Sequence, residues 1–429
     1  MKTKIKIKNS FTRQLSIVVE WKDLKSDFDK KFESVKSNYT PAGGRKGKVQ
    51  GMALDLFKKN YTASIEAQFA EDSISKYYQE GVKELDIVPI NQGKIIDMKF
   101  KSEQNLELEI EFEIKPEFKL PKYDKKFKVT AAKYISSKKD LEDAIADLQN
   151  SHSTMKEINA GAKEGDFLMV DMQEYENGNP IVGKKMEKQY IKLGGGVFQK
   201  KTLKALEGIK KNEKRNTIID INGKKVDYEF LVHKVEEQIL PELNDTFAKK
   251  ADPDVKTLSE LKKKINDNIE QSFENEYVKT VNNAIIDYFI AKTKIEAPDS
   301  MVANYIEHLV QNNKSKQPQM TEAQEEEMRK TSHEGAIFNV KWYLIKDKIV
   351  HDAKLNVSKE DMTNKEAELV EKDPANAKQI KAFLKNPENQ QRFFDDMLSE
   401  KLFMYLKGFA VIKVDKKKSD ELRKMQGVS

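Results

Sequence analysis

Residues 106–114 alternate apolar and acidic side chains without a break. The apolar positions are Leu106, Leu108, Ile110, Phe112 and Ile114, and the acidic positions are Glu107, Glu109, Glu111 and Glu113. Successive side chains of a β-strand point to opposite faces, so the pattern predicts a strand with one buried face and one acidic, solvated face. The chain must therefore contain a sheet that is covered on one side only.

The segments around this strand predict the rest of an α+β domain. Alternating apolar residues at 5–7 and 15–19 predict a hairpin. Helical spacing of apolar residues predicts three helices, at 24–35, 54–57 and 65–82, with a loop over 39–51. We place the end of this domain at residue 116, before Pro121 breaks any helical continuation.

Three further segments complete the prediction of a multidomain α+β protein. Residues 117–149 predict a linker that is first extended and then helical, and residues 150–239 predict a small β-rich domain with Gly-rich turns. Residues 240–429 predict an all-α domain whose long helices form extended arms, interrupted by Pro298, Pro318, Pro374 and Pro387. The closing residues 413–429 have few apolar side chains, which predicts a frayed tail.

Composition narrows the classes of function. The 77 basic and 71 acidic residues nearly balance to +6, which disfavours a dedicated nucleic-acid-binding protein. The absence of cysteine excludes disulfides and thiol catalysis, and the five histidines form no close ligand pair, so we expect neither metal nor cofactor. No apolar run is long enough to cross a bilayer and the N-terminus lacks a secretory signal, so we expect a cytoplasmic protein.

The predicted loop over 39–51 carries three glycines and three cations in six residues: Gly43, Gly44, Arg45, Lys46, Gly47 and Lys48. Glycine allows the backbone to approach a partner closely, and Arg and Lys engage phosphate or carboxylate groups. The alternative is a flexible basic turn without a partner. A phosphate-binding Walker loop is a poorer match, because Lys48 is followed by Val49 rather than by Ser or Thr.

This loop resembles the ribosome-binding signature of bacterial trigger factor, G-F-R-x-G-K-x-P, at Gly43, Arg45, Gly47 and Lys48. Gly44 replaces the aromatic residue and Gln50 replaces the proline, so we expect a looser loop and a weaker grip. Residues 240–249 similarly resemble the Leu-Pro-Glu-Leu segment that opens the family's C-terminal domain. The resemblance implies that the loop contacts protein and RNA of the large ribosomal subunit near the exit tunnel.

The middle segment occupies the place of the family's FKBP-type prolyl isomerase, which encloses a proline ring in an apolar pocket. The resemblance places the pocket at Asp171, Met172, Tyr175, Phe198 and Tyr228. Met172 replaces a phenylalanine, Gln199, Lys200, Lys201, Thr202 and Leu203 replace an Ile-Pro-Gly-aromatic-Glu run, and residues 221–227 are short for a covering flap. We expect weak or absent isomerase activity and a vestigial or peptide-binding pocket; core packing and an active isomerase are the alternatives.

Apolar side chains of the helical segment are candidates for a surface that holds unfolded chains. They are Met301, Tyr305, Leu309, Phe338, Trp342, Phe394, Met397 and Phe403. Packing within the helices is the alternative for each of them, whereas a surface built from several would suit many clients. The resemblance implies an ATP-independent chaperone for unfolded or nascent polypeptides, with no membrane partner; a homodimer of the free protein is compatible with it.

Overall fold

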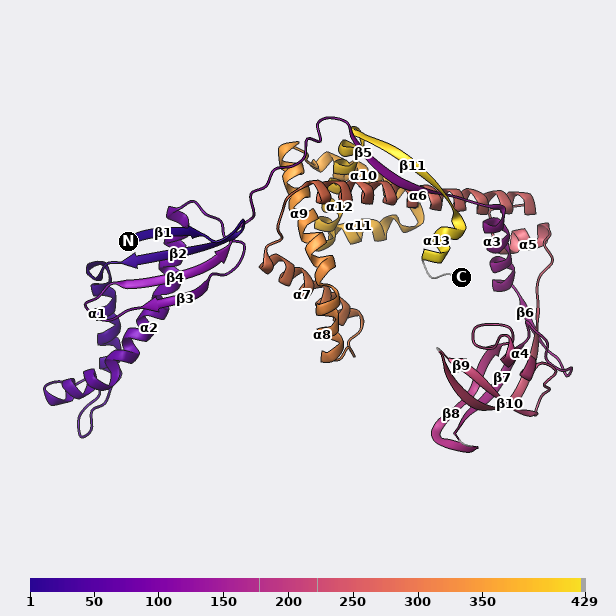
Figure 1. Cartoon of the computed structure of the whole chain (residues 1–429), viewed down its shortest axis with the longest axis horizontal. Helices are drawn as coiled ribbons and strands as arrows, with labels where there is room; N and C mark the ends of the chain where they lie inside the picture. The colour runs from indigo at the N-terminus through magenta and orange to yellow at the C-terminus, as the bar shows by residue number, and fades with distance from the viewer. Residues whose placement is uncertain (177, 222, 426–429) are drawn as a thin grey trace. The chain divides into compact units, whose positions relative to one another are not determined.

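The computed structural model of the protein describes residues 1–176, 178–221 and 223–425 (Figure 1). The chain forms two compact units: residues 1–131 with 281–413, and residues 132–280 with those from 414 onward. Its elements form an α+β region, a β-rich middle and a helical C-terminal region, which confirms the predicted multidomain α+β fold.

The N-terminal region consists of an antiparallel sheet and two helices. The strand order is β1–β2–β4–β3, with bounds β1 Lys2–Ile7, β2 Thr12–Val19, β3 Lys94–Lys99 and β4 Leu106–Glu113. Helices α1 (Trp21–Asn38) and α2 (Met52–Glu84) pack on its apolar face.

As the alternation of residues 106–114 predicts, β4 has one buried apolar face and one acidic face. On β4 the side chains of Leu108 and Ile110 are 1% exposed, and they pair with Ile17 and Leu15 of β2, which are fully buried. The glutamates lie on the other face, where Gln14 donates a hydrogen bond of 2.8 Å to Glu109. Burial of the apolar face against α1 and α2 supplies the core of this region.

Helix α2 differs from the prediction of two helices between residues 54 and 82. Residues 58–64 lack an apolar run, which suggested a break, but they contain neither glycine nor proline. Phe57 and Ile65 are both buried and lie eight residues apart, a spacing that keeps them on one helical face. The helix is therefore continuous over 33 residues, about 50 Å at 1.5 Å per residue.

The helical part of the first unit begins within α6 (Leu258–Lys292). It continues with α7 (Asp299–Lys316), α8 (Glu322–Thr331), α9 (His333–Asp352), α10 (Lys359–Lys372), the 3₁₀ turn η1 (Pro374–Asn376), α11 (Ala377–Lys385) and α12 (Pro387–Lys407). All four prolines singled out in the sequence fall at helix boundaries or in the 3₁₀ turn, because proline cannot donate the hydrogen bond of a helix interior.

The second unit is built on a five-stranded sheet. Its strands are β6 (Thr154–Glu157), β7 (Phe167–Glu176), β8 (Asn179–Lys192), β9 (Lys214–Ile221) and β10 (Lys224–Ile239), in the order β6–β10–β7–β8 with β9 also pairing with β10. The unit also contains α3 (Lys138–Ser151), α4 (Lys201–Leu206), α5 (Asp245–Ala251) and the start of α6. Helix α3 runs across the boundary predicted at residue 149.

The closing residues are not a frayed tail as far as residue 425. Strand β11 (Ala410–Lys418) pairs with β5 (Phe127–Ile135), and helix α13 (Ser419–Met425) follows. The prediction relied on the shortage of apolar side chains, but a strand can be held by its backbone ladder. Ser419 is fully buried and donates a hydrogen bond of 2.7 Å to Asp140. Residues 426–429 of the predicted tail lie outside the described residues.

Candidate functional site

The cationic loop joins α1 to α2 and is anchored at its base by aromatic packing. Tyr39, which follows α1, lies 5.2 Å from the ring of Phe57 and 5.3 Å from that of Tyr61 on α2. Pro41 and Val49, on the two sides of the loop, are both buried. Figure 1 shows the loop at the end of the α1–α2 pair that extends beyond the sheet.

Backbone hydrogen bonds hold the loop between these anchors. The Gly44 amide donates to the Pro41 carbonyl at 2.9 Å, and the Gly47 amide donates to the Tyr39 carbonyl at 2.9 Å. Gly47 has φ +76°, and a Cβ there would lie 2.9 Å from the Ser37 carbonyl oxygen. Only glycine fits this position without strain, because both the dihedral and the close approach exclude a side chain.

The loop presents free cations to solvent. Arg45, Lys46 and Lys48 are exposed, and none of them forms an ion pair within the part of the chain that the structure describes. Cations without an internal partner are available to phosphate or carboxylate groups, and Arg45 can bind these with two hydrogen bonds. A Cβ at Gly44 would lie 2.7 Å from Pro41 Cγ, so this loop conformation does not accommodate the aromatic residue of the family signature.

The predicted pocket residues of the middle region divide between two faces of the sheet. Met172 and Tyr228 are 6% exposed and belong to the core, and Phe198 packs against this core with its ring 6.3 Å from that of Phe230. Asp171 alternates with Val170 and Met172 along β7, so its side chain points to the opposite face.

Tyr175 is half-buried near the end of β7. It pairs in register with Asp227 of β10 and with Pro180 of β8. Tyr175 is not part of the core cluster around Met172 and Tyr228. The structure therefore brings together Met172, Phe198 and Tyr228, and it leaves Asp171 and Tyr175 outside that cluster.

The Asp171 carboxylate interacts with polar groups outside the core cluster. It accepts a hydrogen bond of 2.9 Å from the Lys188 amide, and Lys185 Nζ lies 3.4 Å from its carboxylate. His233 Nε2 lies 2.9 Å from Asp171 Oδ1, although the ring is not aligned for a regular hydrogen bond. Burial raises the pKa of Asp171, but the Lys188 amide, His233 and Lys185 outweigh burial and hold the pKa below its usual range.

In the described part of the chain, the β9–β10 hairpin and the start of α4 do not form the cover and the apolar walls of a proline-binding pocket. Strand β9 ends at Ile221 and β10 begins at Lys224, so the segment expected to be short for a flap is a tight hairpin. Within it the Gly223 amide donates a hydrogen bond of 2.8 Å to Asp220. Lys200 and Lys201 lie exposed at the start of α4. This geometry offers neither a flap nor aromatic walls at these positions.

Three candidate client-binding residues on α7 share one pocket. Met301, Tyr305 and Leu309 follow each other at intervals of four residues and line a cavity of about 760 Å³ together with Val340 and Tyr343 of α9. All three are partly buried, and Tyr343 is 51% exposed. The pocket is mostly apolar and open to solvent, so it can contact an apolar side chain of another molecule without rearrangement of the helices.

The other candidates lie in different surroundings. Phe338 of α9 is 39% exposed. Trp342 stacks on Phe403 of α12 with ring centres 6.0 Å apart, and Phe394 is half-buried on the same helix. Met397 is 7% exposed, so it serves helix packing rather than an open surface.

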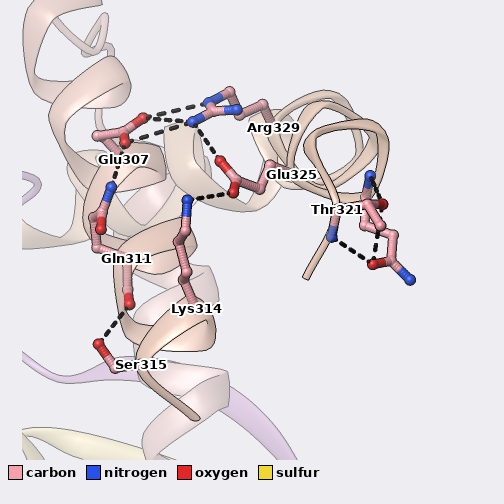
Figure 2. A network of polar contacts seen from close by, with 8 residues as sticks. Glu307, Gln311, Lys314, Ser315, Thr321, Glu325 and Arg329 are labelled. Atoms are coloured by element: carbon pink, nitrogen blue, oxygen red, sulfur yellow. Dashed lines mark hydrogen bonds and ion pairs between the residues drawn. The ribbon is translucent and has the colours of Figure 1, made fainter. Parts of the chain in front are cut away.

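A charged network between α7 and α8 was not predicted from the sequence (Figure 2). Glu325, only 8% exposed, accepts a hydrogen bond of 2.7 Å from Lys314, and Arg329 reaches both Glu325 at 3.4 Å and Glu307 at 3.2 Å. The hydrogen bond from Lys314 is the main reason why the pKa of Glu325 is lowered. The spacing of Glu325 and Arg329 at i and i+4 was the only available signal, and such pairs are common on exposed helices.

Comparisons with known proteins agree on one family. The model described as "Bacterial trigger factor protein (TF)" matches residues 1–148, and the model described as "Bacterial trigger factor protein (TF) C-terminus" matches residues 257–408; together they cover more than half of the chain. Proteins named trigger factor from Bacillus cereus (strain B4264) and Bacillus thuringiensis (strain Al Hakam) are each 27% identical over 370 residues, which is 81% of this chain and 86% of the relative.

A solved structure described as "Promiscuous Substrate Recognition in Folding and Assembly Activities of the Trigger Factor Chaperone" also matches. It aligns with 95% of this chain and 99% of its own length at 18% identity, with a TM-score of 0.49. Within the described residues, no helix combines the length and apolar character needed to span a membrane.

Proposed function

The chain belongs to the bacterial trigger factor family of chaperones, and on that premise we propose that it docks on the large ribosomal subunit through Gly43–Lys48 and shelters emerging polypeptides without ATP. The observation that carries the proposal is the loop itself. Its cations form no ion pair with any residue that the structure describes, and they project from a backbone that Gly47 and the aromatic base constrain. A fixed cationic tip favours a phosphate-rich surface irrespective of base sequence.

The pocket on α7 and α9 supports the chaperone part of the proposal. Met301, Tyr305 and Leu309 offer adaptable and aromatic contacts without a deep, selective cavity. Such a surface accepts many apolar sequences, which suits unfolded clients of different kinds. The sequence contains no nucleotide-binding loop that would couple this surface to ATP.

For the middle region we propose a peptide-binding or scaffolding role with weak or absent isomerase activity. Met172, Phe198 and Tyr228 pack in or against the core, and the flap position is a tight hairpin. Thr202 stands at the aromatic position of the family's Ile-Pro-Gly-aromatic-Glu run, so that pocket wall is missing. An assay of cis–trans isomerisation on a short proline peptide tests this. We expect a rate close to the uncatalysed one, and robust turnover would establish the isomerase alternative.

Co-sedimentation of the full chain with large ribosomal subunits tests the docking proposal. We expect wild type to sediment with the subunits and the variant Arg45→Ala/Lys48→Ala to remain largely in the supernatant, since two exposed cations of the tip are removed. A matched control is Lys83→Ala/Lys94→Ala, which removes the same charge from exposed positions outside the loop. Equal binding of the loop variant and wild type would refute the anchor.

A further inference from the structure

Two large apolar side chains lie exposed directly beside the cationic loop. Met52, the first residue of α2, is 89% exposed, and Leu56, one turn later, is 52% exposed. Burial of such side chains against a partner contributes favourably to binding. Their exposure leaves this contribution unused in the isolated chain.

Met52 and Leu56 do not pack in the core of the N-terminal region. Phe57 of the same helix is fully buried, and Ala53 and Leu54 pack partly against the core. Met52 and Leu56 are four residues apart, so they lie one above the other on the helical face that points away from this packing. Lys59 follows on the same face, three residues beyond Leu56, and is exposed.

The loop itself lacks an apolar contact of this size at its tip. Gly44 occupies the aromatic position of the family signature, and Pro41 blocks a side chain there. The exposed residues of the loop between Ala42 and Gln50 are small, polar or charged. Met52 and Leu56 are therefore the large apolar groups that a partner of the loop meets first along the chain.

We propose that Met52 and Leu56 form the apolar half of the docking surface and insert into an apolar depression of a ribosomal protein beside the phosphates that bind Arg45 and Lys48. This inference rests on the proposed ribosome docking and specifies its chemistry. The cations of the loop supply attraction that depends on salt, and the apolar pair supplies contact area that does not. A surface of both kinds binds a protein–RNA boundary rather than RNA alone.

A membrane surface is the competing partner for an apolar pair among cations, but the details favour a protein. Two side chains on one helical turn give a small insertion, whereas interfacial helices carry a continuous apolar face. Asp55 lies exposed between Met52 and Leu56 in the sequence, and its charge opposes an anionic lipid surface. A protein depression can pair this carboxylate with a donor of its own.

The experiment measures the Kd of the full chain for purified large ribosomal subunits at several salt concentrations. We expect Met52→Ser/Leu56→Ser to bind about tenfold more weakly than wild type at every salt concentration, with an unchanged slope of log Kd against log salt. Arg45→Ala/Lys48→Ala should instead reduce that slope by roughly two counterions. The swap Met52→Leu/Leu56→Met keeps apolar volume and should bind like wild type.

Val88→Ser is the matched control, because Val88 is 79% exposed and follows the other end of α2. It should leave both Kd and slope unchanged. Absence of wild-type binding would contradict the proposed docking as a whole. Wild-type affinity in Met52→Ser/Leu56→Ser, alongside weakened binding in the cation variant, would overturn this inference alone. Loss of binding to anionic phosphatidylserine vesicles in Met52→Ser/Leu56→Ser, with ribosome binding intact, would overturn it in favour of a membrane.

Discussion

Two glycines of the cationic loop differ in how strictly the backbone requires glycine. Gly43 and Gly47 both have positive φ, +70° and +76°, but a Cβ at Gly43 meets open space, whereas one at Gly47 meets the Ser37 carbonyl at 2.9 Å. Gly43→Ala therefore incurs only the left-handed backbone cost, about 1–2 kcal/mol. Gly47→Ala incurs a similar cost together with a backbone clash, and we expect it to be clearly less stable.

Tryptophan fluorescence can isolate this effect in the full chain. The sequence has two tryptophans, and in a Trp342→Phe background Trp21, which packs on Phe28 and Phe100, reports on the N-terminal region. Urea denaturation of the two alanine variants in that background gives their free energies of unfolding. A Gly47→Ala protein as stable as Gly43→Ala would show that the loop does not hold the described conformation.

Residue types predicted an exposed cationic loop, whereas the middle region shows where a prediction from residue types fails. Arg45 and Lys48 are informative because exposed cations need no tertiary context. Asp171 was assigned to the pocket by resemblance, although its apolar neighbours Val170 and Met172 already place it on the other face of a strand. Its partner His233 lies 62 positions away in the sequence, and only the pairing of β7 with β10 brings the two together.

Helices α7 and α8 are joined by a network of charged side chains. Glu325 sits between Lys314 and Arg329 with little exposure (Figure 2). Glu325→Gln removes the negative charge and leaves two cations close together, so we expect faster hydrogen exchange of the α8 amides. Glu326→Gln is the matched control, because its pair with Lys330 is exposed and contributes little. Equal hydrogen exchange of the α8 amides in the two variants would show that the Glu325 charge does not stabilise α8.

The contact between α10 and α12 should weaken in acid. Asp361 accepts hydrogen bonds of 2.7 Å from Lys401 and from the Ser358 amide, and Lys401 above all lowers the pKa of Asp361 from 3.8 to about 2. Because the folded pKa lies below the unfolded value, the stabilisation is complete above pH 3.8 and is lost as the pH falls toward 2.

Thermal unfolding of wild type and Asp361→Asn at several pH values measures this contribution. Wild type should have the higher Tm at neutral pH, and the difference should shrink steadily below about pH 4. A difference that stays constant down to pH 3 would mean that the carboxylate charge does not link these helices.

Helices and strands could be predicted from the sequence where neighbouring residues alone determine them. The four prolines mark helix boundaries through their own chemistry, and β4 follows from its alternation. The continuous α2 and the strand β11 were missed for a shared reason. Residues 58–64 and 413–418 both contain few apolar side chains. Residues 58–64 continue the helix because they contain neither glycine nor proline. Residues 413–418 form a strand because they pair with β5.

The whole molecule combines two features in one chain, an exposed cationic loop and an open apolar pocket. We propose that the loop between α1 and α2 tethers the chain to the ribosome and that the pocket lined by Met301, Tyr305 and Leu309 contacts clients. Tethering raises the effective concentration of this surface near an emerging polypeptide, so even weak contacts suffice. We therefore expect client contact on the ribosome to depend on the loop.

Site-specific photo-crosslinking measures whether client contact depends on the loop. A photoreactive residue replaces Tyr305, and the protein is mixed with ribosomes that carry an arrested nascent chain, at a concentration near the Kd. We expect crosslinks to the nascent chain with the natural loop and loss of most of them in Arg45→Ala/Lys48→Ala, while Lys83→Ala/Lys94→Ala retains them. Crosslinks that persist unchanged in the loop variant would show that client contact does not depend on the loop, and crosslinks that never form would show that the pocket does not meet nascent chains.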